Sequence, residues 1–169
     1  NNFNGLAAYE EKDETPFRFG SFTTMGELYV ETGLNELRMS NYRHILSLDS
    51  AMVVVQFDKD GVQYQRKYFI SYPDSVMVMK FTANQSGKQN LILSYCPNSE
   101  AKSNLRADGK DGLVYTGVLD NNGMKFAFRI KAIHKGGTLE AENDRLIVKG
   151  ADEVVFLLTA DTDYKMNFN

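Results

Sequence analysis

Four consecutive β-strands are predicted by one stretch of the sequence, YRHILSLDSAMVVVQFDKDGVQYQRKYFISYPDSVMVMKFT, residues 42–82. Asp58-Lys59-Asp60-Gly61 marks a turn within it, because aspartate and glycine tolerate the positive φ of hairpin loops. Pro73-Asp74 marks another, because proline cannot donate a hydrogen bond to a strand ladder. Several segments are apolar on both faces, as expected of strands between two packed layers, so the stretch predicts a sheet-on-sheet architecture. The expected strands cover residues 42–48, 51–57, 62–70 and 75–81.

The rest of the chain adds more strands and no helix of ordinary length. The cleanest alternation runs from Met124 to Ile133, where the even-numbered residues are apolar and face inward while Lys125, Arg129 and Lys131 face outward. We expect further strands at 27–32, 90–95, 113–119 and 153–160, with turns at 120–123, 135–137 and 142–144. Residues 33–41 and 97–110 lack periodicity and are expected to be loops. About ten or eleven such strands predict one all-β domain, a β-sandwich, over residues 17–169, after a polar lead-in at residues 1–16.

The composition excludes several classes of function. A net charge of −3 with 24% charged residues argues against a nucleic-acid partner. No apolar run approaches the roughly 20 residues of a membrane-spanning helix, so no membrane association is expected. Cys96 is the only cysteine, which excludes an internal disulfide and a cysteine zinc site. Because the chain begins with Asn1 rather than methionine, we expect it to be an excised piece of a longer protein.

The sequence shows no catalytic or metal-binding pattern. His44 and His134, its two histidines, belong to no metal-ligand spacing and to no Ser/His/Asp arrangement, so neither a metal nor a cofactor is expected. The acids lie mainly in turns, where solvated carboxyl groups make poor general acids. Glu27 and Asp74 are the better placed candidates for ligand contact; a strand-edge role for Glu27 and a turn-closing role for Asp74 are the competing interpretations. Tyr72 is a further candidate, because a tyrosine ring can stack on a sugar.

An ordered series of short motifs resembles a known family. The series consists of residues 42–43, 46–51, 61–66 and 71–76, which follow one another at close spacing. It resembles the N-terminal β-domain of family 95 glycoside hydrolases, the inverting α-L-fucosidases, and more distantly that of the family 65 enzymes. The segment MGELYV, residues 25–30, is similar to the "LGDL" strand of this domain, with Glu27 in place of aspartate. The likeness covers residues 17–163.

The resemblance implies both a fold and a role. The fold is a β-sandwich of the super-sandwich type, with sheets like those of galactose mutarotase. In enzymes of this family the catalytic residues lie in an α/α-toroid domain C-terminal to the β-domain. No such helical segment is present in the sequence, so the chain is expected to carry no catalytic residue and to be inactive alone. The implied partners are the catalytic domain and, in the whole enzyme, a carbohydrate substrate, in a periplasmic or secreted setting.

The implied role is to pack on the catalytic domain and to shape the rim of its active site. The outward residues Lys125, Arg129 and Lys131 are candidates for docking onto an acidic surface, and a solvated strand face is the alternative interpretation. In the family, further strands precede the "LGDL" strand, so the chain is expected to be truncated at its N-terminal edge. A truncated sandwich exposes apolar side chains and unpaired backbone groups, so we expect exposed apolar surface or self-association there.

Two other functions stay open at this point. One is a free-standing carbohydrate-binding module, and the other is a structural or adhesion β-domain without a ligand. The three interpretations predict different surfaces. A docking domain exposes a sizeable apolar patch, a binding module exposes an aromatic platform or a groove, and an adhesion domain exposes neither.

Overall fold

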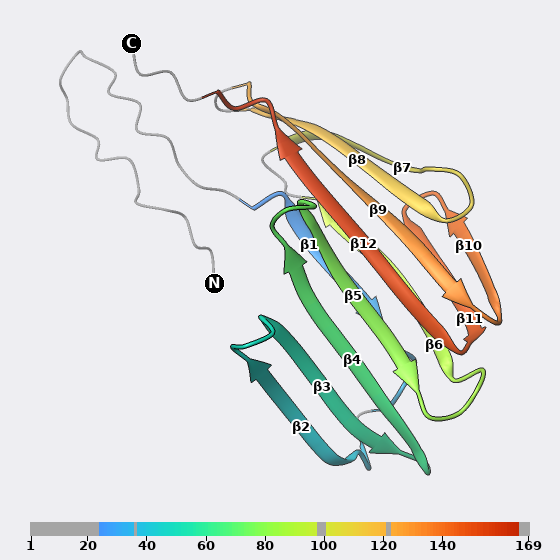
Figure 1. Ribbon diagram of the computed structural model, residues 1–169. Helices are drawn as coiled ribbons and strands as arrows, with labels where there is room; N and C mark the ends of the chain where they lie inside the picture. Colours follow the sequence, from blue (N-terminus) through green and yellow to red (C-terminus); the bar gives the residue numbers. More distant parts are fainter. Residues whose placement is uncertain (1–23, 36, 98–100, 121–122, 166–169) are drawn as a thin grey trace.

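The computed structural model describes residues 24–35, 37–97, 101–120 and 123–165, which form a β-sandwich of two sheets (Figure 1). Within these ranges there are twelve strands and no helix, and all strand pairs are antiparallel. No helix that could span a membrane therefore occurs among the described residues. The predicted all-β sandwich class is confirmed. The lead-in at 1–16 and residues 17–23 of the expected domain lie outside the described part.

The twelve strands include all those expected from the sequence and one more. In chain order they are β1 (Gly26–Glu31), β2 (Ser40–Ser47), β3 (Met52–Lys59), β4 (Val62–Ser71), β5 (Val76–Ala83), β6 (Gln89–Pro97), β7 (Ala101–Ala107), β8 (Gly112–Leu119), β9 (Lys125–Lys135), β10 (Thr138–Glu142), β11 (Arg145–Ala151) and β12 (Glu153–Thr162).

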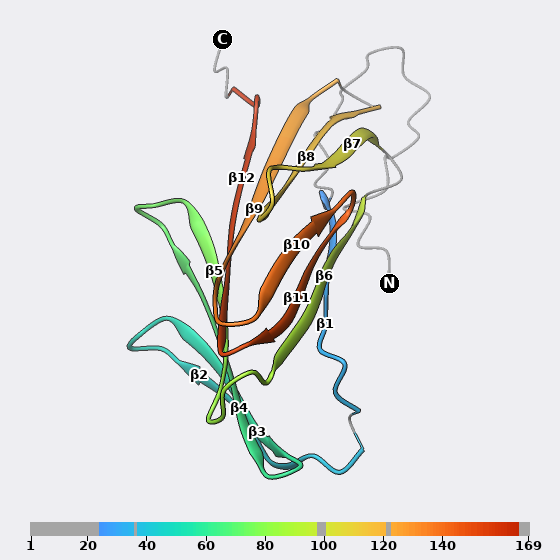
Figure 2. The ribbon, with the colours of Figure 1, turned by 90° about the vertical axis from the view of Figure 1, so that its right-hand side faces the viewer.

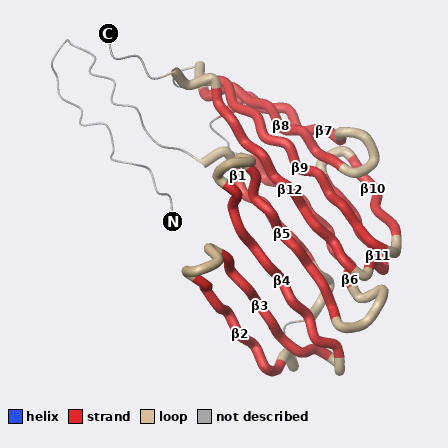
Figure 3. The backbone as a smooth tube through the Cα atoms, viewed as in Figure 1, coloured by secondary structure: helices blue, strands red, loops and turns tan. Residues whose placement is uncertain are grey.

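The two sheets differ in size. The smaller sheet has the order β1-β6-β11-β10, and the larger sheet has the order β2-β3-β4-β5-β12-β9-β8-β7. Strands β6 and β11 of the smaller sheet pack over β5, β8 and β9 of the larger one, as the turned view in Figure 2 shows. The last strand of the chain, β12, lies between β5 and β9 at the centre of the larger sheet, and Figure 3 shows this strand arrangement as a tube.

The main core lies between the sheets, where alternate side chains of each strand point inward. On β9, Phe126, Phe128, Ile130 and Ala132 are buried while the lysines and Arg129 are exposed, so the predicted alternation is confirmed. These inward side chains meet residues of the smaller sheet such as Leu93, which is fully buried. The hydrophobic effect of burying both inward faces holds the layers together.

Aromatic rings join the two layers at the middle of this core. The ring of Tyr95 on β6 lies 4.4 Å from the ring of Phe128 and 4.7 Å from that of Tyr115, measured between centroids. The Tyr95 hydroxyl donates a hydrogen bond to the carbonyl oxygen of Met25, just before β1. Tyr95 therefore combines an apolar ring contact across the sandwich with a polar contact within its own sheet.

Two turns show why particular residues are needed. Asp60 and Gly61 connect β3 to β4 with φ values of +49° and +75°, so the predicted turn is confirmed. Gly137, between β9 and β10, also has a positive φ of +62°. A Cβ at this position would lie 2.2 Å from the carbonyl oxygen of Lys149 on β11, so the hairpin requires glycine there.

A second, smaller core lies on β3 and β4 at the end of these strands that the smaller sheet does not cover. Phe57, Val62 and Tyr64 are buried there, and the loop before β2 packs Leu34 and Met39 against them. The rings of Phe57 and Tyr64 stack with centroids 5.3 Å apart. At this end of the larger sheet, a loop takes the place of the missing second layer.

One expected loop contains a strand. Residues 97–110 were expected to be irregular, but β7 pairs along its full length with β8, from Ala101 opposite Leu119 to Ala107 opposite Leu113. Its only large apolar residue is Leu105, which packs against the main core. One large apolar side chain in seven residues is too weak an alternation to detect, and the strand is ordered by its pairing with β8.

The expectation that the doubly apolar strands of residues 42–82 lie between two packed layers is wrong, because the described chain has only two sheets and each strand is covered on one face at most. The first strand of this stretch, β2, is covered on neither face. Every residue of β2 except Ser47 is exposed. By contrast, Met79 and Phe81 of β5 are buried under the smaller sheet. The physical reason is that a sheet of four strands covers only part of a sheet of eight, and β2 lies at the uncovered edge.

The inward position of Phe128 predicts a large effect on stability. Phe128→Ala should lower the free energy of unfolding by about 3–5 kcal/mol, because it leaves a cavity in the core. Lys125→Ala on the outward face of the same strand should change it by no more than about 0.5 kcal/mol. Denaturant midpoints measure both. A costlier Lys125→Ala would mean that β9 is shifted by one residue in its register.

Tyr95 predicts a loss of stability at alkaline pH. Burial raises the pKa of its phenol well above the ordinary value of 10.0. Above pH 10 the unfolded chain therefore loses this proton while the folded protein keeps it. The stabilisation is complete below pH 10 and is lost as the pH rises toward the folded pKa. Thermal melts should show a decrease in Tm above pH 10 that is shallower in Tyr95→Phe; equal slopes would contradict this assignment.

Candidate functional site

The face of the larger sheet that points away from the smaller sheet carries apolar side chains in registered rows. Residues directly opposite on neighbouring strands point to the same face, so the pairing register gives the rows. The first row crosses six strands from β2 to β9: Ile45, Val54, Lys67, Lys80, Val155 and Ile133. The second crosses four strands from β4 to β9: Phe69, Val78, Leu157 and Lys131.

We call the apolar members of these rows the outer apolar face: Ile45, Val54, Phe69, Val78, Val155, Leu157 and Ile133. Three of them are exposed despite their size, with 44% of Ile45, 36% of Phe69 and 52% of Ile133 accessible to solvent. The others are half-buried by their neighbours on the sheet. In the described part of the chain no second layer covers this face. A contiguous apolar area of this kind marks an interaction surface.

Two lysines separate Ile45 and Val54 from Val155 and Ile133 in the first row, whereas Phe69, Val78 and Leu157 follow one another without interruption in the second. Lys67 and Lys80 are neighbours in the first row, and the ammonium nitrogen of Lys80 lies 2.6 Å from a carboxyl oxygen of Glu153 on β12. Lysine stems can lie along apolar surface while the ammonium group stays in water. The face is therefore amphipathic, as expected of an interface that polar groups surround.

Two hairpin turns beside this face also carry exposed apolar side chains. The β2–β3 turn and the β4–β5 turn both project away from the smaller sheet in Figure 2, toward the left of β12. Leu48, Ile70 and Tyr72, in or beside these turns, are 83%, 71% and 92% exposed. Tyr72 and Leu48 have the highest exposures among the large apolar residues of the described chain.

The structure does not bring together the three residues that the sequence singled out for ligand contact. Glu27 lies on β1 in the smaller sheet and accepts a hydrogen bond from the hydroxyl of Tyr29, which raises the pKa of Tyr29. Tyr72 and Asp74 lie in the β4–β5 turn of the larger sheet. There the Asp74 carboxylate accepts a hydrogen bond of 2.5 Å from the Ser71 hydroxyl. Figure 2 shows this turn and the start of β1 on opposite sides of the molecule.

The three basic residues proposed for docking share the outward face of β9. Two of them already have partners within the domain. Arg129 Nε lies 3.0 Å from a carboxyl oxygen of Asp108, and Lys131 Nζ lies 2.9 Å from one of Asp111. Both aspartates belong to the β7–β8 turn: Asp108 lies within the stretch 97–110 that was expected to be a loop, and Asp111 directly follows it. These ion pairs balance the charge of β9 locally, and docking through Lys125, Arg129 and Lys131 stays a prediction.

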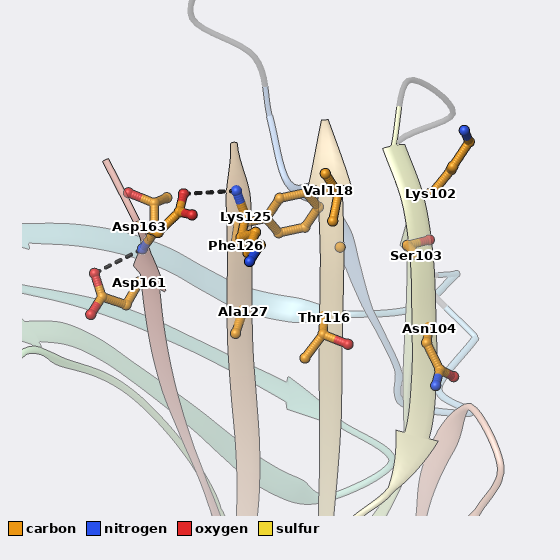
Figure 4. Close-up of a pocket in the computed structure, with 12 residues that line it drawn as sticks. Lys102, Ser103, Asn104, Thr116, Val118, Lys125, Phe126, Ala127, Asp161 and Asp163 are labelled. Carbon is orange, nitrogen blue, oxygen red and sulfur yellow. Dashed lines mark hydrogen bonds between the residues drawn. The ribbon is translucent and has the colours of Figure 1, made fainter. Parts of the chain in front are cut away.

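A hollow of about 690 Å³ lies at the end of the larger sheet where β12, β9, β8 and β7 run side by side. Short residues lie at its centre: Thr116, Gly117 and Ala127. Longer polar side chains surround them, as the close-up in Figure 4 shows: Lys102, Asn104, Lys125, Asp161 and Asp163.

The polar groups of the hollow are partly used to hold its own strands. The Asp163 carboxylate accepts a hydrogen bond of 2.8 Å from the backbone N–H of Lys125, and the backbone N–H of Asp163 donates to the Lys125 carbonyl at 3.0 Å. The one aromatic residue in the lining is Phe126, which is only 5% exposed because it points into the core. The hollow therefore offers hydrogen-bonding groups without an aromatic surface on which a sugar ring could stack.

The described residues offer no recognisable centre for metal chemistry. Among them, no three His, Cys, Asp or Glu side chains lie together in a way that could hold a metal ion. The feature that sequence reasoning missed is the outer apolar face. Its signal is present in the double-sided apolarity of residues 51–57 and 75–81, but the rows appear only once the neighbours of each strand are known.

Comparison with known proteins gives the family of the chain. The family model described as "Glycosyl hydrolase family 65, N-terminal domain" matches residues 4–167. Among solved structures, "Putative kojibiose phosphorylase from human microbiome" is similar with a TM-score of 0.56 at 10% sequence identity, over 81% of this chain and 22% of that chain. At such low identity the structural likeness shows the fold alone.

Two curated relatives carry fucosidase names. The chain is 28% identical over 163 residues to "Probable alpha-fucosidase A" of Aspergillus niger, covering 90% of this chain and 19% of that protein. It is 22% identical over 167 residues to "Alpha-L-fucosidase 2" of Arabidopsis thaliana, covering 85% of this chain and 20% of that protein. The chain thus spans about a fifth of the length of these relatives. The resemblance drawn from the sequence motifs is confirmed, and the chain belongs to the N-terminal domain family of the family 65 glycosyl hydrolases.

Proposed function

We propose that this chain is the non-catalytic N-terminal β-sandwich domain of a carbohydrate-degrading glycoside hydrolase similar to the α-L-fucosidases. Its role is to pack on the catalytic domain of the enzyme and to help shape the rim of the active site. The relatives support this proposal, because the chain matches about a fifth of their length and the remainder is available to supply a catalytic domain.

The observation that carries the proposal is the outer apolar face. Burial of apolar surface contributes about 25 cal/mol per Å², so rows of exposed isoleucine and phenylalanine beside half-buried valine favour a second layer over solvent. A docking domain is the one of the three candidate functions that requires such a surface. Domain interfaces within one chain are of this mixed apolar and charged kind.

The hollow beside β7 to β9 is the feature that favours the alternative, a carbohydrate-binding module. Amide, hydroxyl and carboxylate groups such as those of Asn104, Thr116 and Asp161 can hydrogen-bond sugar hydroxyls. Without an aromatic platform, however, affinity for a free sugar would depend on those exposed polar contacts alone. The docking role therefore accounts for more of the surface than sugar binding does.

The isolated chain should not hydrolyse glycosides. Glycoside hydrolysis needs two opposed carboxyl groups around one bond, and Glu27 and Asp74 lie on different sheets. We expect no turnover of an aryl α-L-fucoside by the purified chain above the buffer rate. Turnover that disappears in Glu27→Ala or Asp74→Ala would contradict the non-catalytic role.

Docking should protect the outer apolar face from solvent. Hydrogen exchange can be compared between residues 1–169 alone and the longer protein translated from the same reading frame. Backbone amides around Phe69, Val78 and Leu157 should exchange more slowly in the longer protein. Amides of β10 should exchange at equal rates in both.

Matched substitutions separate docking from folding. Phe69 and Tyr29 are both exposed aromatic residues, on the larger and the smaller sheet respectively. In the longer protein, Phe69→Gln should weaken the protection and Tyr29→Gln should leave it unchanged. The docking proposal fails if the longer protein shows no added protection of this face.

A further inference from the structure

In the part of the chain that the structure describes, the two sheets end in four edge strands: β1, β10, β2 and β7. An edge strand presents unpaired N–H and C=O groups to which another strand can add, and proteins commonly block this with charge or shortness. β1 carries Glu27 and Glu31, and β10 has five residues that include Glu140 and Glu142. β7 carries Lys102 and Arg106. Three of the four edges are therefore protected.

The fourth edge, β2, is different. With eight residues it is the longest of the four, and it exposes Tyr42, Ile45 and Leu46. Arg43 and His44 are its only residues that can carry charge. A register shift between Ser40 and Arg43 disturbs pairing at the start of the strand, but residues 43–47 pair regularly with β3. The regular half of β2, residues 43–47, is thus a mainly apolar edge. It has no acidic residue and no proline that would block the addition of another strand.

We propose that the free edge of β2 is a self-pairing site, at which a second copy of this chain adds antiparallel and continues the larger sheet. This interaction is separate from docking to a catalytic domain. The ligand class is an extended strand with apolar side chains on both of its faces, because Ile45 and Leu46 point to opposite faces of the sheet. Main-chain hydrogen bonds supply the pairing and these side chains set its register.

Symmetry restricts the register. A two-fold axis perpendicular to the sheet keeps both outer faces on one side, so each residue must oppose a residue of the same face. Among the registers that this allows, the one with Ile45 opposite Ile45 of the second copy places His44 opposite Leu46 of that copy and Arg43 opposite its Ser47. No like charges then meet, which favours a second copy as the occupant. The first apolar row, Ile45 and Val54, would continue into the same row of the other copy.

The first test is the molar mass of residues 1–169 by light scattering across a concentration series. It should rise from 19.1 kDa toward twice that value. Ile45→Lys places two lysines opposite each other and should weaken association about tenfold or more. Ile133→Lys is the matched control, because Ile133 is on the same face and similarly exposed but lies on the interior strand β9. It should leave association unchanged.

A second test reads the register directly. In a Cys96→Ser background, Ile45→Cys should form a disulfide-linked dimer under mild oxidation, and Ile133→Cys should not. A wild-type chain that stays monomeric at all concentrations overturns the proposal. So does equal weakening by Ile45→Lys and Ile133→Lys, which would assign association to the outer apolar face, or a dimer that Ile45→Cys does not cross-link. None of these results bears on docking, which is measured in the longer protein.

Discussion

The mismatch in size between the two sheets is the constraint on which the rest of the structure depends. Eight strands present inward side chains, and four strands can cover only part of them. The smaller sheet is placed over β5, β8 and β9, where the main core forms. The loop that carries Leu34 and Met39 closes a second core over β3 and β4. β2 receives neither cover, so its exposure results from this mismatch rather than from weak strand chemistry.

The local sequence pattern predicts well where strands lie, but it predicts poorly which strands are neighbours in a sheet. The alternation of β9 and the turn at Asp60-Gly61 follow from period two and from backbone sterics, and both could be read from the sequence. The position of β12 between β5 and β9 could not, because any antiparallel strand with the same period satisfies the same local rules. β7 escaped detection because its partner supplies the order that its own composition lacks. Strand order is therefore the step that the structure adds.

The same distinction applies to the site. Glu27, Tyr72 and Asp74 were chosen by residue type, which says nothing about distance across a sandwich. The structure places Glu27 on β1 of the smaller sheet, away from Tyr72 and Asp74 in the β4–β5 turn of the larger sheet. The outward direction of Lys125, Arg129 and Lys131 was predictable from the strand period. Their ion-pair partners were not, because Asp108 lies in a stretch without periodicity and Asp111 directly follows it. The outer apolar face depends on Phe69, Val78 and Leu157 being neighbours, which only the register specifies.

Apolarity on both faces of a strand has a cost when one face meets water, because each exposed isoleucine or phenylalanine gives up burial worth roughly 1.5–3 kcal/mol. The domain has this cost at β2, at β4 and along the outer face, while its other three edges carry charge. Protection is thus selective: charge appears where the sheets end in solvent and apolar rows appear where a further layer or strand can add. The two proposals assign these surfaces separately, the sheet face to a catalytic domain and the β2 edge to a second copy. The separation follows from geometry, because side chains perpendicular to a sheet bind a packing layer, whereas backbone groups in its plane bind only another strand.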